Sequence, residues 1–267
     1  MVIKMTRIIL SGCNGTMGKV VTACTETRAD CGIAAGIDLN PIESKDFPVY
    51  PHISEVTAAA DVIIDFSHPD ALSGLLKYAL ERKLPVVLAT TGLSPAGLGG
   101  VKAAAAEIPV FMSGNMSLGV NLLTELVKTA ARVLGGSFDI EIVEAHHNRK
   151  IDAPSGTALM LAEAANDAAG GKYHYVYERE SRREKREKSE IGIHSIRGGS
   201  IVGEHEVIFA GHGEVLTLSH SAISKEVFAS GALEAALFLV SKAPGLYDMS
   251  DLVGAPGAKP AQRRRKS

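Results

Sequence analysis

The stretch Thr6-Arg-Ile-Ile-Leu-Ser-Gly12-Cys-Asn-Gly15-Thr-Met-Gly18 decides the fold. Its apolar run predicts a buried strand over 6–11, and its three glycines lead into a helix predicted over 17–27. Glycines permit a tight strand-to-helix turn and close approach to a phosphate, which the N–H groups of the helix N-terminus attract. The spacing is GxxGxxG, not GxGxxG, and Asp38 follows Gly18 by 20 residues, where a dinucleotide fold carries its ribose-binding acid. We predict a dinucleotide-binding turn, the alternative being a purely structural turn.

Short strands and longer helices alternate along residues 6–114. Further strands are predicted at 31–37, 61–66, 85–90 and 108–113, with helices between them at 69–82 and 95–107. The strands are almost wholly apolar, which indicates a parallel sheet covered by helices on both faces. We therefore predict an α/β fold whose first part is a Rossmann-like, doubly wound parallel sheet.

The pattern changes after a helix predicted over 117–134, in which Leu118, Leu122, Leu126 and Val133 recur near helical spacing. The following strands, with a helix over 157–168 among them, indicate an antiparallel sheet in a smaller α+β domain; they are predicted at 138–143, 191–196, 201–210 and 213–219. A last helix over 226–240 is expected to return to the first domain. The expected domains are therefore 1–117 with 227–267, and 118–226.

Composition favours a small-molecule partner. The 267 residues carry 28 Lys and Arg against 30 Asp and Glu, so there is no general electrostatic attraction to nucleic acid or to an anionic membrane. No apolar run approaches the roughly 18 residues of a membrane helix, and the apolar run near the N-terminus is too short for a signal peptide. The three cysteines form no CxxC or Cys/His ligand spacing and are expected to be reduced and non-catalytic. We expect a cytoplasmic protein.

Three polar clusters follow predicted strands of the first domain. Ligands of such sheets bind at the carboxyl ends of the strands, so these clusters are expected to line the cofactor crevice, although each alone is also ordinary turn chemistry. The clusters are Phe66-Ser67-His68-Pro69, Ala89-Thr90-Thr91-Gly92 and Ser113-Gly114-Asn115-Met116-Ser117.

The residues around Asp38 favour NADH over NADPH. A carboxylate accepts hydrogen bonds from both ribose hydroxyls and repels a 2′-phosphate. Asp38 is followed by Leu39 and Asn40, which offer no cation to such a phosphate, although Lys45 is close enough in sequence to reach it.

Charged and titratable side chains are most concentrated in one segment between a predicted strand and a predicted helix, Glu144-Ala-His146-His147-Asn-Arg149-Lys150-Ile-Asp-Ala-Pro-Ser155-Gly156-Thr157. Two histidines, two cations and the N–H groups of a helix N-terminus make this segment attractive to a carboxylate substrate. A histidine can also donate a proton near neutral pH. The alternatives are structural histidines or a metal-binding pair, but no third ligand stands at a recognisable spacing, and we expect no metal.

Two other features are less specific. The histidines of the predicted second sheet, among them His194, His205 and His220, are expected to be structural residues. Residues 178–190 hold six basic and five acidic side chains, which indicates either a solvated surface segment or a mobile loop that covers the substrate.

These motifs resemble the dihydrodipicolinate reductase family. The similarity rests on Gly12 to Gly18, Ala89 to Gly92, Ser113 to Ser117 and, above all, Glu144 to Thr157. Later segments, Arg197-Gly-Gly-Ser-Ile-Val-Gly-Glu-His205 and Gly245-Leu-Tyr-Asp-Met249, also match, so the resemblance spans nearly the whole chain.

The resemblance implies an NAD(P)H-dependent oxidoreductase of diaminopimelate and lysine biosynthesis. Such enzymes reduce 4-hydroxy-tetrahydrodipicolinate, through dihydrodipicolinate, to tetrahydrodipicolinate by hydride transfer to C4 and protonation at C3. The first domain is then dinucleotide-binding and the second binds substrate and forms a homotetramer. Some members carry Arg where this chain has Thr16 and Leu39, which again favours NADH, with NADPH also accepted.

The resemblance also assigns roles to individual positions. It makes His146 and Lys150 the proton-donating pair and His147, Gly156 and Thr157 substrate-binding residues. The implied cofactor positions are Gly12, Cys13, Asn14, Gly15, Thr16, Met17, Asp38, Ala89, Thr90, Thr91, Ser113, Gly114, Asn115 and Met116. The rival functions are a dehydrogenase of amino acids or semialdehydes, and a non-catalytic NAD(H)-sensing regulator; neither accounts for the 144–157 segment.

Overall fold

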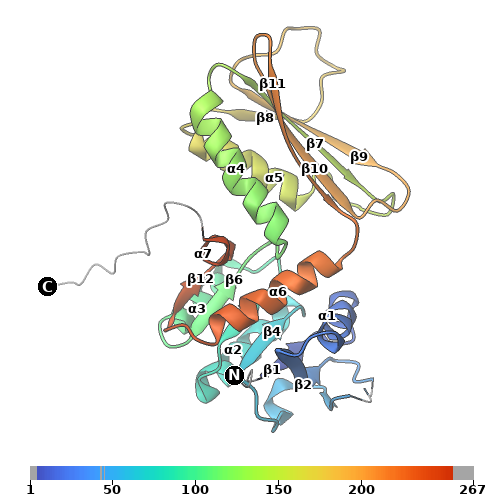
Figure 1. Cartoon of the computed structure of the whole chain (residues 1–267), viewed down its shortest axis with the longest axis vertical. Helices are drawn as coiled ribbons and strands as arrows, with labels where there is room; N and C mark the ends of the chain where they lie inside the picture. The colour runs from blue at the N-terminus through green and yellow to red at the C-terminus, as the bar shows by residue number, and fades with distance from the viewer. Residues whose placement is uncertain (1–4, 43, 45, 255–267) are drawn as a thin grey trace, which may run out of the picture. The chain divides into compact units, whose positions relative to one another are not determined.

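The computed structural model describes residues 5–42, 44 and 46–254 (Figure 1). The chain divides into two compact units, one made of the residues up to Leu118 and from Glu226 onward, the other of Gly119–Lys225. Lys45 lies outside the described residues. Each unit contains its own sheet.

The first unit is built on a parallel sheet of seven strands in the order β12-β6-β5-β4-β1-β2-β3, which confirms the predicted doubly wound fold. From β1 the chain adds β2 and β3 on one side, and then adds β4, β5, β6 and β12 on the other side. The boundary between β1 and β4 is therefore the topological switch point at which such folds bind ligands. The strands are β1 (Thr6–Ser11), β2 (Cys31–Ile37), β3 (Val49–Tyr50), β4 (Val62–Asp65), β5 (Val86–Leu88), β6 (Pro109–Met112) and β12 (Gly245–Tyr247). The sequence did not predict β3 and β12, because two or three residues carry no periodic signal.

Helices cover both faces of this sheet. Alternate residues of β1 enter different cores: Ile8 and Leu10 pack with α1 (Thr16–Glu26) and α6 (Glu226–Leu239), and Ile9 packs with α2 (Leu72–Arg82) and α3 (Pro95–Ala105). The short helices η1 (Ile53–Glu55), η2 (Pro69–Ala71) and α7 (Met249–Val253) complete the unit.

Small residues bring α6 close to the sheet. Gly231 lies against the backbone of Met116 so closely that a Cβ there would overlap the Met116 carbonyl oxygen. Ala229, Ala232 and Leu233 are fully buried on the same helix. At the surface, Arg28 donates to Glu234 of α6 over 2.8 Å. Helix α6 thus belongs to the same compact unit as the first part of the chain.

The second unit contains a five-stranded mixed sheet in the order β11-β10-β7-β9-β8. The predicted antiparallel sheet is only partly right, because β10 is antiparallel to β7 and β11, whereas β9 is parallel to β7 and β8. The physical reason is the length of the connections: helix α5 (Gly156–Ala168) and the segment 177–189 each return the chain before the next strand begins. The strands are β7 (Asp139–His146), β8 (His174–Val176), β9 (Glu190–Arg197), β10 (Gly203–Ala210) and β11 (Val215–Ala222).

Helices α4 (Leu118–Leu134) and α5 lie on one face of this sheet (Figure 1). The buried residues of α4 are Val120, Leu123, Thr124, Val127 and Ala131, of which Leu123, Val127 and Ala131 belong to the core of this unit. The apolar residues whose spacing predicted this helix, Leu118, Leu122, Leu126 and Val133, are instead exposed. The helix was predicted correctly, but its most conspicuous leucines do not form its buried face.

The charged segment 178–190 is tied to the sheet. Arg186 donates to Glu141 over 2.9 Å, to Asp139 over 3.0 Å and to the backbone oxygen of Glu190 over 2.6 Å. Arg179 donates to the carboxylate of Glu190 over 2.6 Å. Asp139 and Glu141 alternate along β7 with the residues that face the helices, so this loop is anchored on the opposite face from His146. The anchored part of the segment is therefore held in place, and a loop that covers the substrate stays a prediction.

None of the described helices combines the length and the apolar composition that crossing a bilayer requires.

Candidate active site

The turn between β1 and α1 depends on two glycines. Gly12 has a φ of 77°, and a Cβ on it would lie 2.6 Å from the carbonyl oxygen of Phe66, at the end of the neighbouring strand β4. A Cβ on Gly18 would overlap the carbonyl oxygens of Gly12 and Cys13. Gly12 therefore lets the backbone turn beside β4, and Gly18 lets the helix start close to that turn.

The N-terminus of α1 suits a phosphate. Its cap is Gly15, which is exposed and makes no side-chain capping bond. The helix has no acidic residue in its first turn, so its N–H groups and dipole face solvent without a competing carboxylate. Thr16 is also exposed and Met17 is half-buried at this position. These features fit the pyrophosphate of a dinucleotide.

Asp38 follows β2 and joins two loops. Its Oδ2 accepts the N–H of Asn14 over 3.0 Å, and its Oδ1 accepts the N–H of Asn40 over 3.0 Å. The side chain of Asn14 donates to the carbonyl oxygen of Asn40 over 2.8 Å. The carboxylate is thereby fixed in orientation beside the glycine turn, and each oxygen retains lone-pair capacity for a ribose hydroxyl.

A cavity of about 880 Å³ opens beside these residues. Its walls come from the ends of β1, β2 and β4 and from α2, and they include Gly12, Gly15, Asp38, Phe66 and Tyr78. This is the switch point of the sheet, and the volume is typical of a cofactor site.

The sequence missed a buried carboxylate at the end of β4. Asp65 is 1% exposed and accepts the hydroxyls of Ser67 over 2.6 Å and Thr90 over 2.7 Å. It thereby joins two of the predicted polar clusters. The strand prediction included Asp65 as an interior residue, although a charge at the end of an apolar strand was itself a signal.

The other predicted cofactor positions lie after β5 and β6. The hydroxyl of Ser113 donates to the backbone oxygen of Asn115 over 2.8 Å, which closes the turn after β6. Gly114 and Thr91 are exposed, Ala89 is half-buried, and Met116 is a core residue. The Cys13 side chain is also buried, and this burial raises the pKa of its thiol to about 11, in keeping with a non-catalytic cysteine.

Glu144 is the centre of the second site. It is fully buried, and its two oxygens accept a bidentate pair of bonds from Arg197 over 2.7 and 2.8 Å. The Nδ1 of His146 lies 2.6 Å from the same carboxylate, and the N–H of Ser155 donates to it over 3.2 Å. Burial alone would raise the pKa of Glu144, but hydrogen bonds from Arg197, Ser195 and His146 outweigh it and lower the pKa to about 2. Glu144 is thus a carboxylate at any physiological pH.

Ser155 caps helix α5 and connects it to β10. Its hydroxyl accepts the N–H of Ala158 over 3.1 Å and lies 2.9 Å from the Nε2 of His205. The His205 ring packs edge-on against His146, with 5.2 Å between ring centroids. Burial, and then the nearby His146, lower the pKa of His205 to about 4. The sequence predicted a structural histidine here, and the structure places His205 within the site.

The rest of the segment surrounds the α5 N-terminus. Lys150 donates to Asp152 over 2.9 Å. The Nδ1 of His147 is buried and has no hydrogen-bond partner within the described part of the chain. Gly156 is exposed with open space where a Cβ would lie, and Thr157 is half-buried. His146 is therefore linked through Glu144 to Ser155, directly before Gly156 and Thr157, and Lys150 is linked to Asp152 in the same loop.

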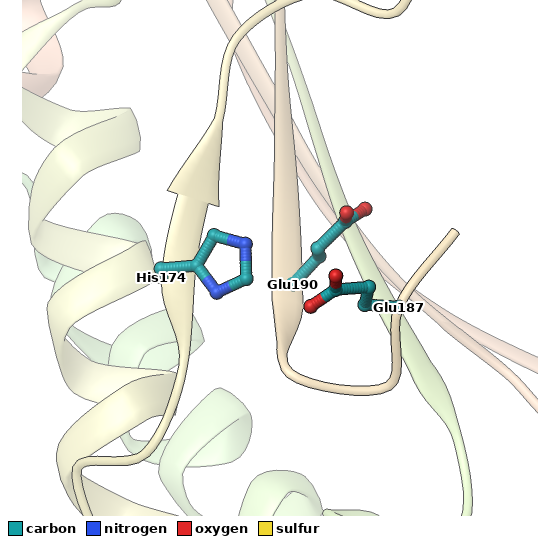
Figure 2. A group of neighbouring side chains, drawn as sticks. All are labelled: His174, Glu187 and Glu190. Atoms are coloured by element: carbon teal, nitrogen blue, oxygen red, sulfur yellow. The ribbon is translucent and has the colours of Figure 1, made fainter. Parts of the chain in front are cut away.

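A different group has metal-ligand geometry. Among the described residues, His174, Glu187 and Glu190 place one ligand atom each within 4.8 Å of one another, and Figure 2 shows them on β8, on the following loop and on β9. The carboxylate of Glu190 already pairs with Arg179 and lies 3.7 Å from Arg182. Because a cation there would compete with two guanidinium groups, we assign no metal to it.

Two family models match the chain. The model described as "Dihydrodipicolinate reductase, N-terminus" matches residues 6–116, and "Dihydrodipicolinate reductase, C-terminus" matches residues 119–253.

Curated relatives agree with these models. A 4-hydroxy-tetrahydrodipicolinate reductase from Caldanaerobacter subterraneus subsp. tengcongensis is 57% identical over 249 residues, which cover 93% of this chain and 98% of the relative. The protein of that name from Clostridium tetani is 49% identical over 245 residues, covering 92% and 96%. A dipicolinate-bound dihydrodipicolinate reductase from Paenisporosarcina sp. TG-14 shares the fold, with a TM-score of 0.78 and 24% identity over 91% of this chain and 97% of that one.

Proposed function

Since the chain belongs to the dihydrodipicolinate reductase family, we propose that it reduces 4-hydroxy-tetrahydrodipicolinate, through dihydrodipicolinate, to tetrahydrodipicolinate with NAD(P)H. This is an oxidoreductase step of diaminopimelate and lysine biosynthesis. The observation that carries the proposal is that one segment, Glu144 to Thr157, holds a histidine, a lysine and a helix N-terminus whose first residue, Gly156, is exposed. Such a group binds a carboxylate and supplies a proton at the same place.

The first unit would hold the cofactor. Its glycine-capped helix, Asp38 and the cavity beside them fit the pyrophosphate and the adenosine ribose. Turns at Ala89 to Thr91 and Ser113 to Met116 are the further positions we propose for binding, with Cys13 and Met116 acting through backbone because their side chains are buried. When bound, the reduced nicotinamide supplies the hydride that reduces C4 of the substrate ring.

The second unit would bind the substrate and supply the proton. We assign the substrate carboxylates to the N–H groups of Gly156 and Thr157 and to His147, whose buried Nδ1 has no partner in the described residues. After the hydride reaches C4 of the substrate and electron density moves toward the substrate's ring nitrogen, His146 donates the proton to C3. Lys150 is the second proton-donating and substrate-binding group. The cationic segment also balances the charge of a dicarboxylate.

We propose NADH as the preferred cofactor, with NADPH also accepted. Asp38 faces the cavity, and the next residue, Leu39, is an exposed apolar side chain that cannot neutralise a 2′-phosphate. Asp38→Ala is expected to weaken NADH binding about tenfold and NADPH binding less, because only NADH has both hydroxyls for the carboxylate. Dissociation constants from cofactor fluorescence would measure this, and equal losses for both cofactors would contradict the role of Asp38.

We further propose that the protein is a cytoplasmic homotetramer. The sheet face of the second unit opposite α4 and α5 has no helix over it among the described residues, and an open sheet face supports self-association. Cys13, Cys24 and Cys31 are free thiols, as is usual in the cytoplasm. Light scattering at several protein concentrations would give the number of subunits.

The deciding experiment is an activity assay on the full chain. Substrate is made in place by condensing pyruvate with aspartate semialdehyde, and oxidation of NADH or NADPH is followed by absorbance. Rapid oxidation that requires both condensation partners is the expected result, and the two rates give the cofactor preference. No oxidation by folded protein that binds NADH would overturn the proposed reaction in favour of another dehydrogenase or a non-catalytic NAD(H) sensor.

A further inference from the structure

The buried carboxylate of Glu144 has no role in the reaction as proposed so far, although it contacts the proton donor directly. We propose that Glu144, held by Arg197, is a positioning residue that fixes one tautomer of His146 and ties this histidine to the substrate-binding helix N-terminus. This inference rests on the proposed function and adds two residues to its machinery.

The first step is that four N–H groups donate to the two oxygens of Glu144, in addition to the hydrogen bond from Ser195. Arg197 donates to both oxygens, His146 to one and the Ser155 N–H to the other. Each oxygen therefore accepts two N–H donors, which satisfies a carboxylate that is completely removed from water. A buried carboxylate with this set of partners stays ionised and keeps a fixed orientation.

The second step concerns His146. Since an ionised carboxylate only accepts hydrogen bonds, the ring atom facing it, Nδ1, carries a hydrogen. The other nitrogen, Nε2, is then the one that exchanges a proton with the substrate. Nε2 lies beside Gly203, where a Cβ would come within 3.1 Å of it, so the glycine leaves space next to this nitrogen.

The proton balance follows from this tautomer. The imidazolium form of His146 gives its Nε2 proton to C3 of the substrate and becomes a neutral ring that keeps the Nδ1 hydrogen. Solvent then returns a proton to Nε2. Glu144 is not protonated at any stage, and its charge stabilises the imidazolium before transfer.

The third step is the link to substrate binding. The Ser155 N–H that Glu144 accepts belongs to the cap of α5, directly before Gly156. Arg197 also donates to the backbone oxygen of Asp152 over 2.7 Å, in the same loop. One Arg–Glu pair thus fixes both the proton donor and the turn that would bind the substrate carboxylate.

The charged and titratable groups around His146 come from several elements. Glu144 precedes it on β7, Arg197 comes from β9, His205 from β10, and Lys150 and Asp152 from the loop. His205 is neutral near pH 7, because burial and the nearby His146 lower its pKa to about 4. Among the described residues, Glu144 is the carboxylate that has a hydrogen bond to the His146 ring.

The test compares Glu144→Gln with Glu141→Gln in the full enzyme. Glu141 lies on the same strand but on the opposite face, and it too binds an arginine and a histidine. Glu144→Gln is expected to lower kcat at pH 8 at least tenfold and to move the alkaline limb of the kcat profile down by about one pH unit, because an imidazolium without its counter-charge deprotonates earlier. Glu141→Gln is expected to leave the profile in place. An unchanged profile in Glu144→Gln would overturn the proposal.

A second measurement covers the case in which Glu144→Gln does not fold. Nitrogen-15 NMR of the histidine rings in the wild-type protein, assigned with His146→Gln, distinguishes the two neutral tautomers. A hydrogen on Nδ1 of His146 supports the proposal, and one on Nε2 overturns it. This readout does not need turnover, so failure of the proposed reaction, seen as inactive wild-type protein, is distinguished from failure of the positioning role.

Discussion

On each face of strand β7 a glutamate binds an arginine and a histidine, with different results. On one face Glu144 binds Arg197 and His146, and on the other Glu141 binds Arg186 and His194. The side chain of Glu144 is 0% exposed and that of His146 is 12% exposed, against 22% for Glu141 and 42% for His194. Both glutamates have a lowered pKa, because their hydrogen bonds outweigh the effect of burial, which alone would raise it.

The difference between the two groups therefore lies in the burial of the glutamate and of the histidine, not in residue type, because the two arginines are exposed to a similar extent, 20% for Arg197 and 17% for Arg186. In the Glu141 group the ion pairs anchor the segment 177–189. In the Glu144 group the carboxylate is fully buried and accepts the N–H of Ser155, the cap of helix α5, so that the group can act on an anion bound at that helix N-terminus. The same chemistry serves anchoring on one face and the candidate site on the other.

The largest contrast is expected in catalysis. His146→Gln should lower kcat by about 10² to 10⁴-fold, because it removes the group that donates a proton in the transition state. The matched variant His194→Gln should keep kcat within about twofold, since its ring lies on the other face. Steady-state assays of both variants measure this difference. Equal losses would mean that the two faces do not differ as described.

Unfolding stability is expected to separate the two glutamates next. Glu144→Ala should lower the free energy of unfolding by about 3–5 kcal/mol, because it leaves Arg197 without its buried counter-charge. Glu141→Ala should cost about 1 kcal/mol or less, since Arg186 keeps the Asp139 carboxylate and three backbone oxygens as acceptors. Urea unfolding followed by circular dichroism measures both. Similar values for the two variants would indicate that burial does not distinguish these ion pairs.

The sequence predicted the elements of this fold better than the contacts of the site. Period-two and period-3.6 patterns gave the parallel strands and the helices, and the glycine turn gave the nucleotide side, because both signals are local. Glu144 and Arg197 are 53 residues apart, and only the parallel pairing of β7 with β9 brings them together. The predicted antiparallel sheet assigns no register and does not include the parallel β7–β9 pairing. His205 was missed although its strand does pair antiparallel with β7, because the sequence does not set the register that places it opposite Glu144.

The spacing of Glu144 and His146 was a local signal that the sequence analysis did not use. Residues two apart on a strand lie on the same face, so Glu144 would have been expected beside His146 had the strand predicted over 138–143 continued to residue 146, as β7 does. The leucines of α4 show a different error, in which an apolar face was identified correctly as helical but proved to be exposed. Helical spacing identifies such a face but not whether another element covers it.

A smaller contrast is expected in the pH dependence of stability. The pKa of His205 is lowered in the folded state to about 4, mainly by burial, so the unfolded chain binds a proton that the folded chain does not between about pH 6.5 and pH 4. The stability from the neutral His205 is thus present above pH 6.5 and is lost as the pH falls toward 4, by no more than about 3 kcal/mol.

His205→Gln should flatten this part of the stability profile, because glutamine does not titrate. His194→Gln, on the exposed side, is the control and should keep the wild-type slope. Urea midpoints between pH 7 and pH 4 give the slopes. A variant at position 205 with the wild-type slope would show that other groups cause the acid sensitivity.

The smallest effect is expected from the anchor on the exposed face. Arg186→Ala removes the guanidinium that donates to Asp139, Glu141 and three backbone oxygens, so the segment 177–189 should exchange its amide hydrogens faster. The cost in unfolding free energy should be about 1 kcal/mol, and kcat should stay within about twofold, because this loop is tied to the face opposite His146.

Arg183→Ala, which changes an exposed arginine of the same loop, is the matched control and should alter neither exchange nor stability. Hydrogen exchange followed by mass spectrometry resolves this segment directly. If Arg186→Ala lowered kcat without loosening the loop, the Glu141 face of β7 would contribute to the reaction. The assignment of anchoring to that face and of the candidate site to the Glu144 face would then be wrong. If it loosened the loop and kept kcat, the Glu141 group would be an anchor only, since the loop could then move without disturbing proton transfer at His146.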